Sequence, residues 1–249
     1  MKDPAAFHWP EGKRAAVSLT FDDARSSQVD RGLPILGRHG VRATFYVSVK
    51  AVRARLDDWK AVAAAAHEIG NHSWSHPCTG NFPWSQKFPL EKMTLEDMAE
   101  DLDRASEEIE GLLSLRPRTF AYPCGQTCVG RGEGNRSYVP LIAIRFLVGR
   151  GFKSEVVNDP LFFDPAIAMG VEADGLAFDG LKALADQSLQ SGGWLILAGH
   201  EVGEGKRQCV PAEALDAFCA YCQDAANGIW IGTVESIGEY ILAHRNPPE

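Results

Sequence analysis

The chain has 249 residues, of which 45% are hydrophobic and 23% charged, the balance of an ordinary soluble globular protein. Its 33 acidic residues outnumber its 25 basic ones, and the net charge of −8 argues against nucleic-acid binding, which requires clustered positive charge. The apolar runs are too short to span a bilayer, so a membrane-embedded protein is also not expected.

Short strand-like apolar runs alternate with helix-like segments along the whole chain. Thr94 is a suitable N-cap because Asp97 follows three residues later, and this pair predicts the start of the longest helix. In chain order, the pattern predicts a strand at 15–21, a helix at 28–38, a strand at 41–47, a helix at 57–68, a helix at 94–113, a strand at 119–122, helices at 138–148 and 176–190, a strand at 194–198, a helix at 211–226, a strand at 229–231 and a helix at 234–243.

Alternation of strands and helices is typical of βα units, which form a parallel sheet. About seven such units in one domain spanning residues 1–249 favour an α/β fold, a distorted (β/α) barrel of about seven parallel strands. A doubly wound open sheet is the alternative architecture.

Polar side chains follow several of the predicted strands, and in a βα barrel such positions share the catalytic face. Taken singly, a pair of aspartates, an HxxxH spacing or one histidine is a weak signal. Their shared position after strands is what suggests a common site. These segments are Asp22-Asp23, Pro123-Cys124-Gly125 and Gly199-His200-Glu201, together with His72-Ser73-Trp74-Ser75-His76, which follows the segment Glu68-Ile69-Gly70-Asn71.

The chain resembles the NodB-type polysaccharide deacetylases, carbohydrate esterase family 4, over nearly its whole length. Thr20-Phe21-Asp22-Asp23 matches the first motif of that family letter for letter, and His72-Ser73-Trp74-Ser75-His76 matches the second, H-[ST]-x-x-H. The apolar run Leu195-Ile196-Leu197 before His200 is similar to the fifth. The resemblance implies the NodB-homology type of barrel and removal of N- or O-linked acetyl groups from a carbohydrate.

The resemblance also implies roles for individual residues. Asp23, His72 and His76 are expected to hold one divalent metal, most simply zinc, with positions left open for water and substrate. Asp22 is expected to act as the general base toward the attacking water, and His200 as the general acid that protonates the leaving group.

Further residues are expected around the substrate. The backbone N–H of Cys124 is expected in the oxyanion hole, with Pro123, Tyr122 and Trp74 in the substrate-binding region. Aromatic residues of the 74–88 segment, Trp84 among them, are candidates for stacking on sugar rings.

Two family motifs are altered. The third commonly reads R-x-P-Y, with an arginine that orients the base, whereas this chain has Ala121-Tyr122-Pro123-Cys124. Arg116 or Arg118 is the expected substitute. No fourth motif, normally an Asp with a Trp that braces the catalytic histidine, stands out, and its acidic residue is expected among Glu172, Asp174 and Asp179.

The six cysteines are too few for a disulfide scaffold. Cys219 and Cys222 form a CxxC inside a predicted helix and are interpreted as packing residues, and Cys124 as a liner of the pocket. Residues 1–4 lack the apolar segment of a secretory signal, which predicts a cytoplasmic protein unless a leader has been removed.

Two other functions remain open at this point. The same metal site could hydrolyse a small amide or cyclic amide instead of a carbohydrate. A non-catalytic carbohydrate-binding relative is the third hypothesis, and the intact Asp22, Asp23, His72, His76 and His200 argue against it.

Overall fold

A computed structural model describes residues 7–205 and 207–245, so the N-terminal residues 1–4 lie outside the described part of the chain. Its main feature is a sheet in which every paired strand runs parallel to its neighbours. The strands of this sheet are β1 (Ala15–Asp22), β2 (Thr44–Val47), β3 (Glu68–Asn71), β4 (Thr119–Ala121), β7 (Val148–Arg150), β8 (Val171–Glu172), β9 (Trp194–Gly199) and β12 (Ile229–Ile231).

The strand order is β7-β4-β3-β2-β1-β9-β8, and β12 pairs with the first half of β1. The two ends of this order approach each other through one short segment. Ala168 bridges to Arg150 of β7, and three residues later Val171 of β8 pairs with Leu197 of β9. The expected distorted barrel of parallel strands is therefore confirmed, and the open doubly wound sheet is not observed.

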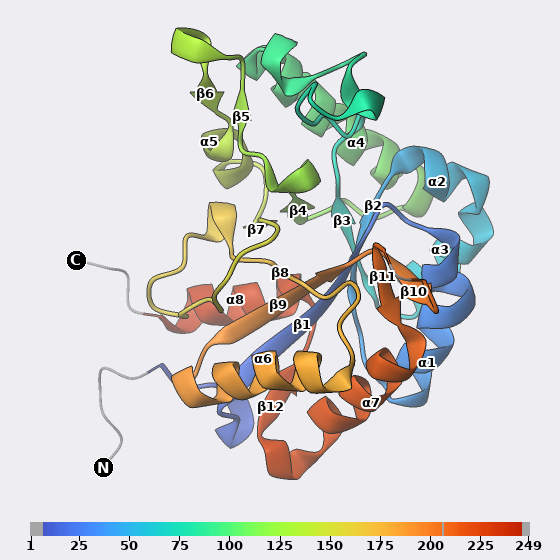
Figure 1. Cartoon of the computed structure of the whole chain (residues 1–249), viewed down its shortest axis with the longest axis vertical. Coiled ribbons are helices and arrows are strands. Elements are labelled where there is room, and N and C mark those ends of the chain that lie inside the picture. Colours follow the sequence, from blue (N-terminus) through green and yellow to red (C-terminus); the bar gives the residue numbers. More distant parts are fainter. Residues whose placement is uncertain (1–6, 206, 246–249) are drawn as a thin grey trace.

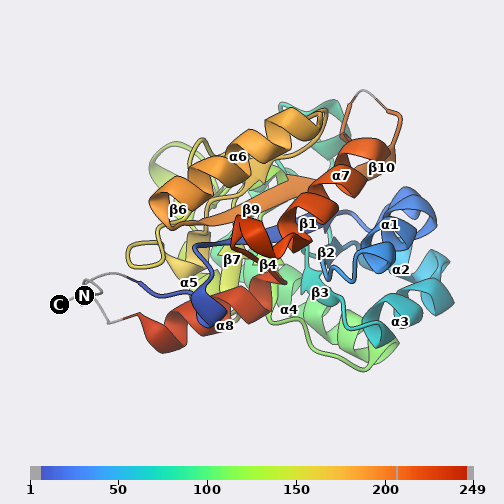
Figure 2. The same cartoon turned by 90° about the horizontal axis from the view of Figure 1, so that it is seen from below.

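The strand β1 lies at the centre of this sheet, and all eight of its residues are buried (Figure 1). In Figure 2, α6 and α8 lie on opposite sides of β9 and β1. The remaining helices lie outside the strands. The helices are α1 (Leu33–Arg38), α2 (Val49–Ala54), α3 (Leu56–Ala64), α4 (Leu95–Leu113), α5 (Val139–Ala143), α6 (Phe178–Ser191), α7 (Ala212–Gln223) and α8 (Val234–His244).

The sequence of the amphipathic helix α4 determines where the helix begins and which face is buried. Thr94 accepts a hydrogen bond from the backbone N–H of Asp97, and the Asp97 carboxylate accepts one from the backbone N–H of Thr94, which completes a capping box. Met98, Leu102 and Ile109 lie on the buried face, as helical spacing predicts.

Three short strands of the main sheet were missed by the sequence pattern. The predicted helix at 57–68 ends at Ala64, and Glu68–Asn71 forms β3 instead. The predicted helix at 138–148 is only α5, and the chain then enters β7, Val148–Arg150. The two-residue strand β8, Val171–Glu172, was also absent from the prediction. Strands of two to four residues are too short for a recognisable period, so contacts with neighbouring strands decide them.

Two small two-stranded β-structures lie outside the main sheet. They are a hairpin of β5 (Cys128–Val129) and β6 (Arg136–Ser137), and a parallel pair of β10 (Glu201–Gly203) and β11 (Cys209–Pro211). Within the described ranges, the longest helices are too polar or too short to cross a bilayer.

Candidate metal and catalytic site

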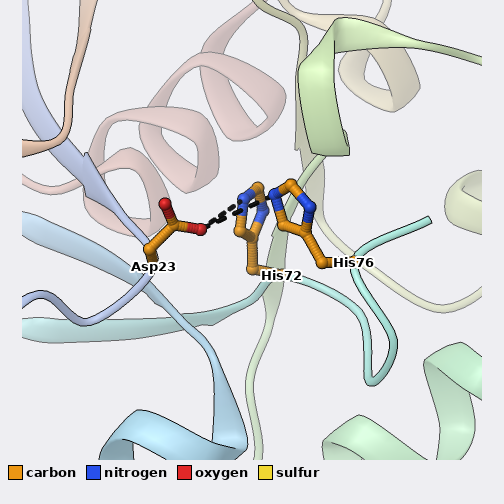
Figure 3. A group of neighbouring side chains, drawn as sticks. All are labelled: Asp23, His72 and His76. Atoms are coloured by element: carbon orange, nitrogen blue, oxygen red, sulfur yellow. Dashed lines mark ion pairs between the residues drawn. The ribbon is translucent and has the colours of Figure 1, made fainter. Parts of the chain in front are cut away.

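Asp23, His72 and His76 meet at the carboxyl ends of β1 and β3 (Figure 3). The Nε2 atoms of His72 and His76 lie 3.7 and 3.6 Å from Oδ1 of Asp23. One donor atom from each residue falls within 4.8 Å of the others, which suits three ligands around one ion. The structure thus brings together the three residues that the motifs predicted as ligands.

The histidines are oriented for this purpose. Nδ1 of His72 bonds the carbonyl oxygen of Ala121 at 2.9 Å, so Nε2 is the nitrogen directed at Asp23. Burial and the neighbouring His72 lower the pKa of His76 to about 4, so at neutral pH this imidazole is uncharged, the form that binds metals. Two imidazole nitrogens and one carboxylate oxygen are donors that fit a divalent ion such as zinc.

The candidate base Asp22 forms a buried ion pair with Arg150, the last residue of β7. Arg150 is fully buried, donates to the Gly151 carbonyl oxygen at 3.0 Å, and lies 5.1 Å from the centre of the Tyr46 ring. Burial alone would raise the pKa of Asp22, but the charge of Arg150, with smaller contributions from His72 and His200, holds it below its ordinary value.

Arg150 therefore stands where the missing third-motif arginine was expected to act, and the expectation for Arg116 and Arg118 is wrong. Both of those side chains are about half exposed and pair with other surface residues. Arg116 contacts Glu110, and Arg118 contacts Glu235 and Glu239. The only sequence signal for Arg150 is an arginine at the end of an apolar run, and the predicted helix concealed that run.

The candidate acid His200 follows β9 and is paired with Asp174. Nδ1 of His200 lies 2.6 Å from Oδ2 of Asp174, whose other oxygen accepts from the His200 backbone N–H at 3.0 Å. Burial would lower the pKa of His200, but the bond to Asp174 and the charge of Asp22 outweigh it and raise the pKa. Of the three acidic candidates for the fourth motif, Asp174 is the one that contacts the histidine.

Gln28 is a fully buried residue that the sequence reasoning missed. Its Nε2 donates to the carbonyl oxygen of Asp22 at 2.6 Å and to that of His200 at 2.9 Å. One side chain thus joins the backbones that carry the candidate base and the candidate acid. A glutamine six residues beyond an aspartate has no recognisable motif, so only the tertiary contact reveals it.

Of the residues expected in the substrate-binding region, Tyr122 occupies another position. Tyr122 is completely buried in the core, and its hydroxyl donates to the Ala166 carbonyl oxygen at 2.6 Å, so its side chain cannot contact a substrate. The Trp74 ring packs against the main core and lies 3.8 Å below the Arg104 guanidinium. It lines a cavity of about 550 Å³ together with Phe88, beside α4. Pro123 is buried directly before Cys124.

Cys124 is joined to Cys78 by a disulfide that spans 46 residues of sequence. Cys78 follows His76 by two positions, and its sulfur lies 3.8 Å from Nδ1 of His76. The bond therefore ties the loop of a metal-ligand candidate to the loop of the oxyanion candidate, and Cys124 is more than the inert pocket liner that was expected. Cys219 and Cys222 are buried free thiols, as packing residues should be.

Several residues of the site have left-handed backbones that side chains rarely adopt. The φ angles of Asp23, Ser73, His76 and Cys124 are 76°, 62°, 49° and 55°. Each such residue costs on the order of 1 kcal/mol or more, and such residues cluster where function fixes a side chain. These left-handed residues lie together with the metal-ligand and oxyanion candidates at the carboxyl ends of the barrel strands.

The fold and this site define the class of NodB-type polysaccharide deacetylases. Residues 10–130 of the chain match the model of the polysaccharide deacetylase family. The resemblance seen in the motifs is thereby confirmed over residues 10–130.

Named relatives match over short segments. The peptidoglycan-N-acetylglucosamine deacetylase PgdA of Listeria monocytogenes is 39% identical over 79 residues, which are 30% of this chain and 17% of PgdA. The protein YlxY of Bacillus subtilis is 36% identical over 97 residues, or 39% of this chain and 27% of YlxY. The chain thus spans well under half the length of these curated relatives.

Solved structures confirm the fold over almost the whole chain. A Mycobacterium smegmatis protein that carries the polysaccharide deacetylase name aligns with a TM-score of 0.72 and 19% identity, covering 99% of this chain and 97% of that one. A pseudoenzyme of carbohydrate esterase family 4 from Bacillus anthracis aligns with a TM-score of 0.56 and 18% identity, covering 90% of this chain and 65% of its own.

Proposed function

We propose that this protein is a metal-dependent hydrolase that removes acetyl groups from a carbohydrate. The observation that carries the proposal is the pairing of its two titratable groups with opposite partners. Asp22 pairs with the cation Arg150 and His200 with the anion Asp174. These partners favour an ionised carboxylate and a protonated imidazole at the same pH, the states that a general base and a general acid require.

The chain's own residues account for each proton transfer. Asp22, held ionised by Arg150, accepts a proton from the attacking water. His200, held by Asp174 through Nδ1, then gives its Nε2 proton to the departing amine or alkoxide. The backbone N–H of Cys124 donates to the oxygen that becomes negatively charged.

Asp23, His72 and His76 would hold the metal between these groups. A divalent ion bound there lowers the pKa of water and polarises the carbonyl of the scissile bond.

Carbohydrate is the favoured substrate because aromatic side chains are exposed beside the metal-ligand candidates. The rings of Phe82 and Trp84 stack at 5.1 Å, and the Trp84 ring centre lies 5.8 Å from that of His76. Trp84 is 60% exposed. An exposed aromatic face next to the reacting bond suits the apolar face of a sugar ring, and the name of PgdA places N-acetylglucosamine among the substrates of relatives.

The test is metal analysis of the purified protein followed by an acetate-release assay. We expect about one equivalent of divalent metal, most simply zinc, and acetate release from an N-acetyl oligosaccharide. His72→Ala should lose both. Full metal occupancy in His72→Ala would refute the site. Hydrolysis of small amides without oligosaccharide activity would indicate the alternative substrate class, and metal binding without any turnover a carbohydrate-binding relative.

We also propose that the protein works in an oxidising compartment, contrary to the cytoplasmic expectation. Disulfides persist outside the reducing cytosol, and Cys78 is bonded to Cys124. Thiol titration of protein isolated from its native source under denaturing, non-reducing conditions should find four free cysteines, Cys128, Cys209, Cys219 and Cys222. Six titratable thiols would contradict this proposal.

A further inference from the structure

The two oxygens of the Asp23 carboxylate have different partners. Oδ1 faces the Nε2 atoms of both histidines, at 3.7 Å from His72 and 3.6 Å from His76. Oδ2 accepts two hydrogen bonds from Arg25, one from Nε at 3.1 Å and one from Nη2 at 2.9 Å. One oxygen is therefore left for the metal, and the other is held by the arginine.

Arg25 is itself fixed by residues beyond β9. Its Nη1 lies 3.5 Å from a carboxylate oxygen of Glu201, and its Nη2 donates to the side-chain oxygen of Gln208 at 3.1 Å. Glu201 also accepts a hydrogen bond from Ser27. Because Glu201 directly follows His200, Arg25 connects the turn that carries Asp23 to the strand end that carries the candidate acid.

The backbone around Asp23 needs such support. Asp23 and Ala24 are consecutive residues with left-handed φ angles of 76° and 57°. Each departs from the conformation that a residue with a side chain prefers, so the turn is costly in isolation. The two hydrogen bonds from Arg25, two positions further on, close this turn and fix the direction of the Asp23 side chain.

A cation beside a metal site would by itself oppose binding of a divalent ion. Arg25 is also only partly buried, with 28% of its side chain exposed, and ion pairs at such positions add little to stability. Neither charge balance nor overall stability therefore explains the contact. What the contact supplies is geometry, because a planar guanidinium directs two N–H groups at one carboxylate.

We propose that Arg25 is a positioning residue that makes Asp23 a ligand through Oδ1 alone. With Oδ2 engaged by Arg25, the carboxylate cannot turn to offer both oxygens, and two imidazoles plus one oxygen leave coordination positions open for substrate and water. This inference rests on the proposed metal site.

The experiment measures metal affinity of the metal-free protein by competition with a chromophoric zinc chelator, without any activity assay. Arg25→Ala should bind Zn²⁺ about 10-fold to 100-fold more weakly than wild type, the usual effect of losing a hydrogen-bond partner of a ligand. Arg25→Lys keeps the charge but loses the planar pair of donors, so it should also weaken binding.

Arg145→Ala is the matched control. Arg145 also donates from Nε and Nη2 to one carboxylate, that of Asp103, at 2.8 Å for each bond and with one bond to each oxygen, on the outer surface between α5 and α4. It should bind zinc as wild type does. Glu201→Gln weakens the support of Arg25 without touching Asp23, and it should lower affinity by a smaller factor. This variant keeps the test decisive if Arg25→Ala does not fold.

Unchanged or tighter zinc binding in Arg25→Ala would overturn the inference, since a purely electrostatic role predicts tighter binding. Wild-type affinity in Arg25→Lys would also overturn it, because charge alone would then suffice. A wild-type protein that binds no zinc, or a His72→Ala variant that binds it fully, would refute the metal site itself and this inference with it. A failure of the Arg25 inference alone is thus distinguishable from a failure of the metal site.

Discussion

Asp22 and Glu68 are two carboxylates buried at opposite ends of the barrel, 4% and 8% exposed. Asp22 ends β1 and pairs with Arg150, and its pKa is lowered. Glu68 begins β3, and burial raises its pKa because only hydrogen bonds oppose the loss of solvent. The same type of side chain at nearly the same burial is thus shifted in opposite directions, and one buried cation makes the difference.

The partners of Glu68 indicate a structural role. Its carboxylate accepts from the hydroxyls of Thr44 and Thr119 and from the backbone N–H of Glu235 in the first turn of α8. An acceptor at that position satisfies a helix N-terminus. Buried carboxylates alone therefore do not mark an active site, and the charged partner together with the rim position does.

The largest expected effect is a difference in turnover between variants of Asp22 and variants of Glu68. Asp22→Asn should retain the metal and lower kcat by roughly 10² or more, because the general base is removed. Glu68→Gln should leave kcat within about twofold, since no substrate reaches it. Metal content and acetate release would be measured for both variants, and near wild-type turnover in Asp22→Asn would exclude it as the base.

Removing the Arg150 cation should make the pKa of Asp22 shift in the same direction as that of Glu68. In Arg150→Met the burial of Asp22 is no longer opposed by a positive neighbour, so its pKa should rise. The acidic limb of the rate profile then moves to higher pH, and activity on that limb falls about tenfold for each unit of the move. The control is Arg118→Ala, whose profile should match wild type. An unmoved limb in Arg150→Met would remove Arg150 from this role.

The alkaline limb tests the other pair. His200 must be protonated to act as the acid, and Asp174 raises its pKa, so activity is present below that pKa and is lost as pH rises through it. Asp174→Asn should move the alkaline limb to lower pH and leave the acidic limb in place. If both limbs move together, or neither moves, the Asp174–His200 assignment fails.

The smallest expected effect concerns stability. The folded-state pKa of Glu68 is raised, so its contribution to the free energy of unfolding is fully present below its unfolded pKa and declines as pH rises through the folded value. Glu68→Gln cannot ionise and should lack this decline, a difference on the order of 1 kcal/mol. Urea unfolding between pH 4 and 8 measures it, and parallel curves for both proteins would contradict the prediction.

The sequence was sufficient to predict the site residues that lie within short motifs. Asp22, Asp23, His72 and His76 occur in two local patterns after strands, and the parallel fold brings such patterns to one rim. The order of strands and helices was also largely predictable, because most helices have a clear apolar face.

The partners of these residues could not be predicted. Arg150 contacts Asp22 across 128 positions of sequence, and Asp174 was one of three equal candidates until its contact with His200 was seen. Arg150 also lies in a three-residue strand that the sequence pattern did not predict. Residues that pair with the site only through a tertiary contact have no periodic signal in the sequence.

The Cys78–Cys124 disulfide has a consequence for the unfolded chain. A cross-link that closes a loop of 46 residues removes conformational entropy from the denatured ensemble, a stabilisation of about 4 kcal/mol in the chain-entropy model. The loop contains α4 and β4, and its ends lie next to His76 and in the third-motif segment. Reduction of this disulfide would therefore remove a stabilisation that is a large share of a typical domain's net stability. The loss would fall on the segment that carries the candidate site.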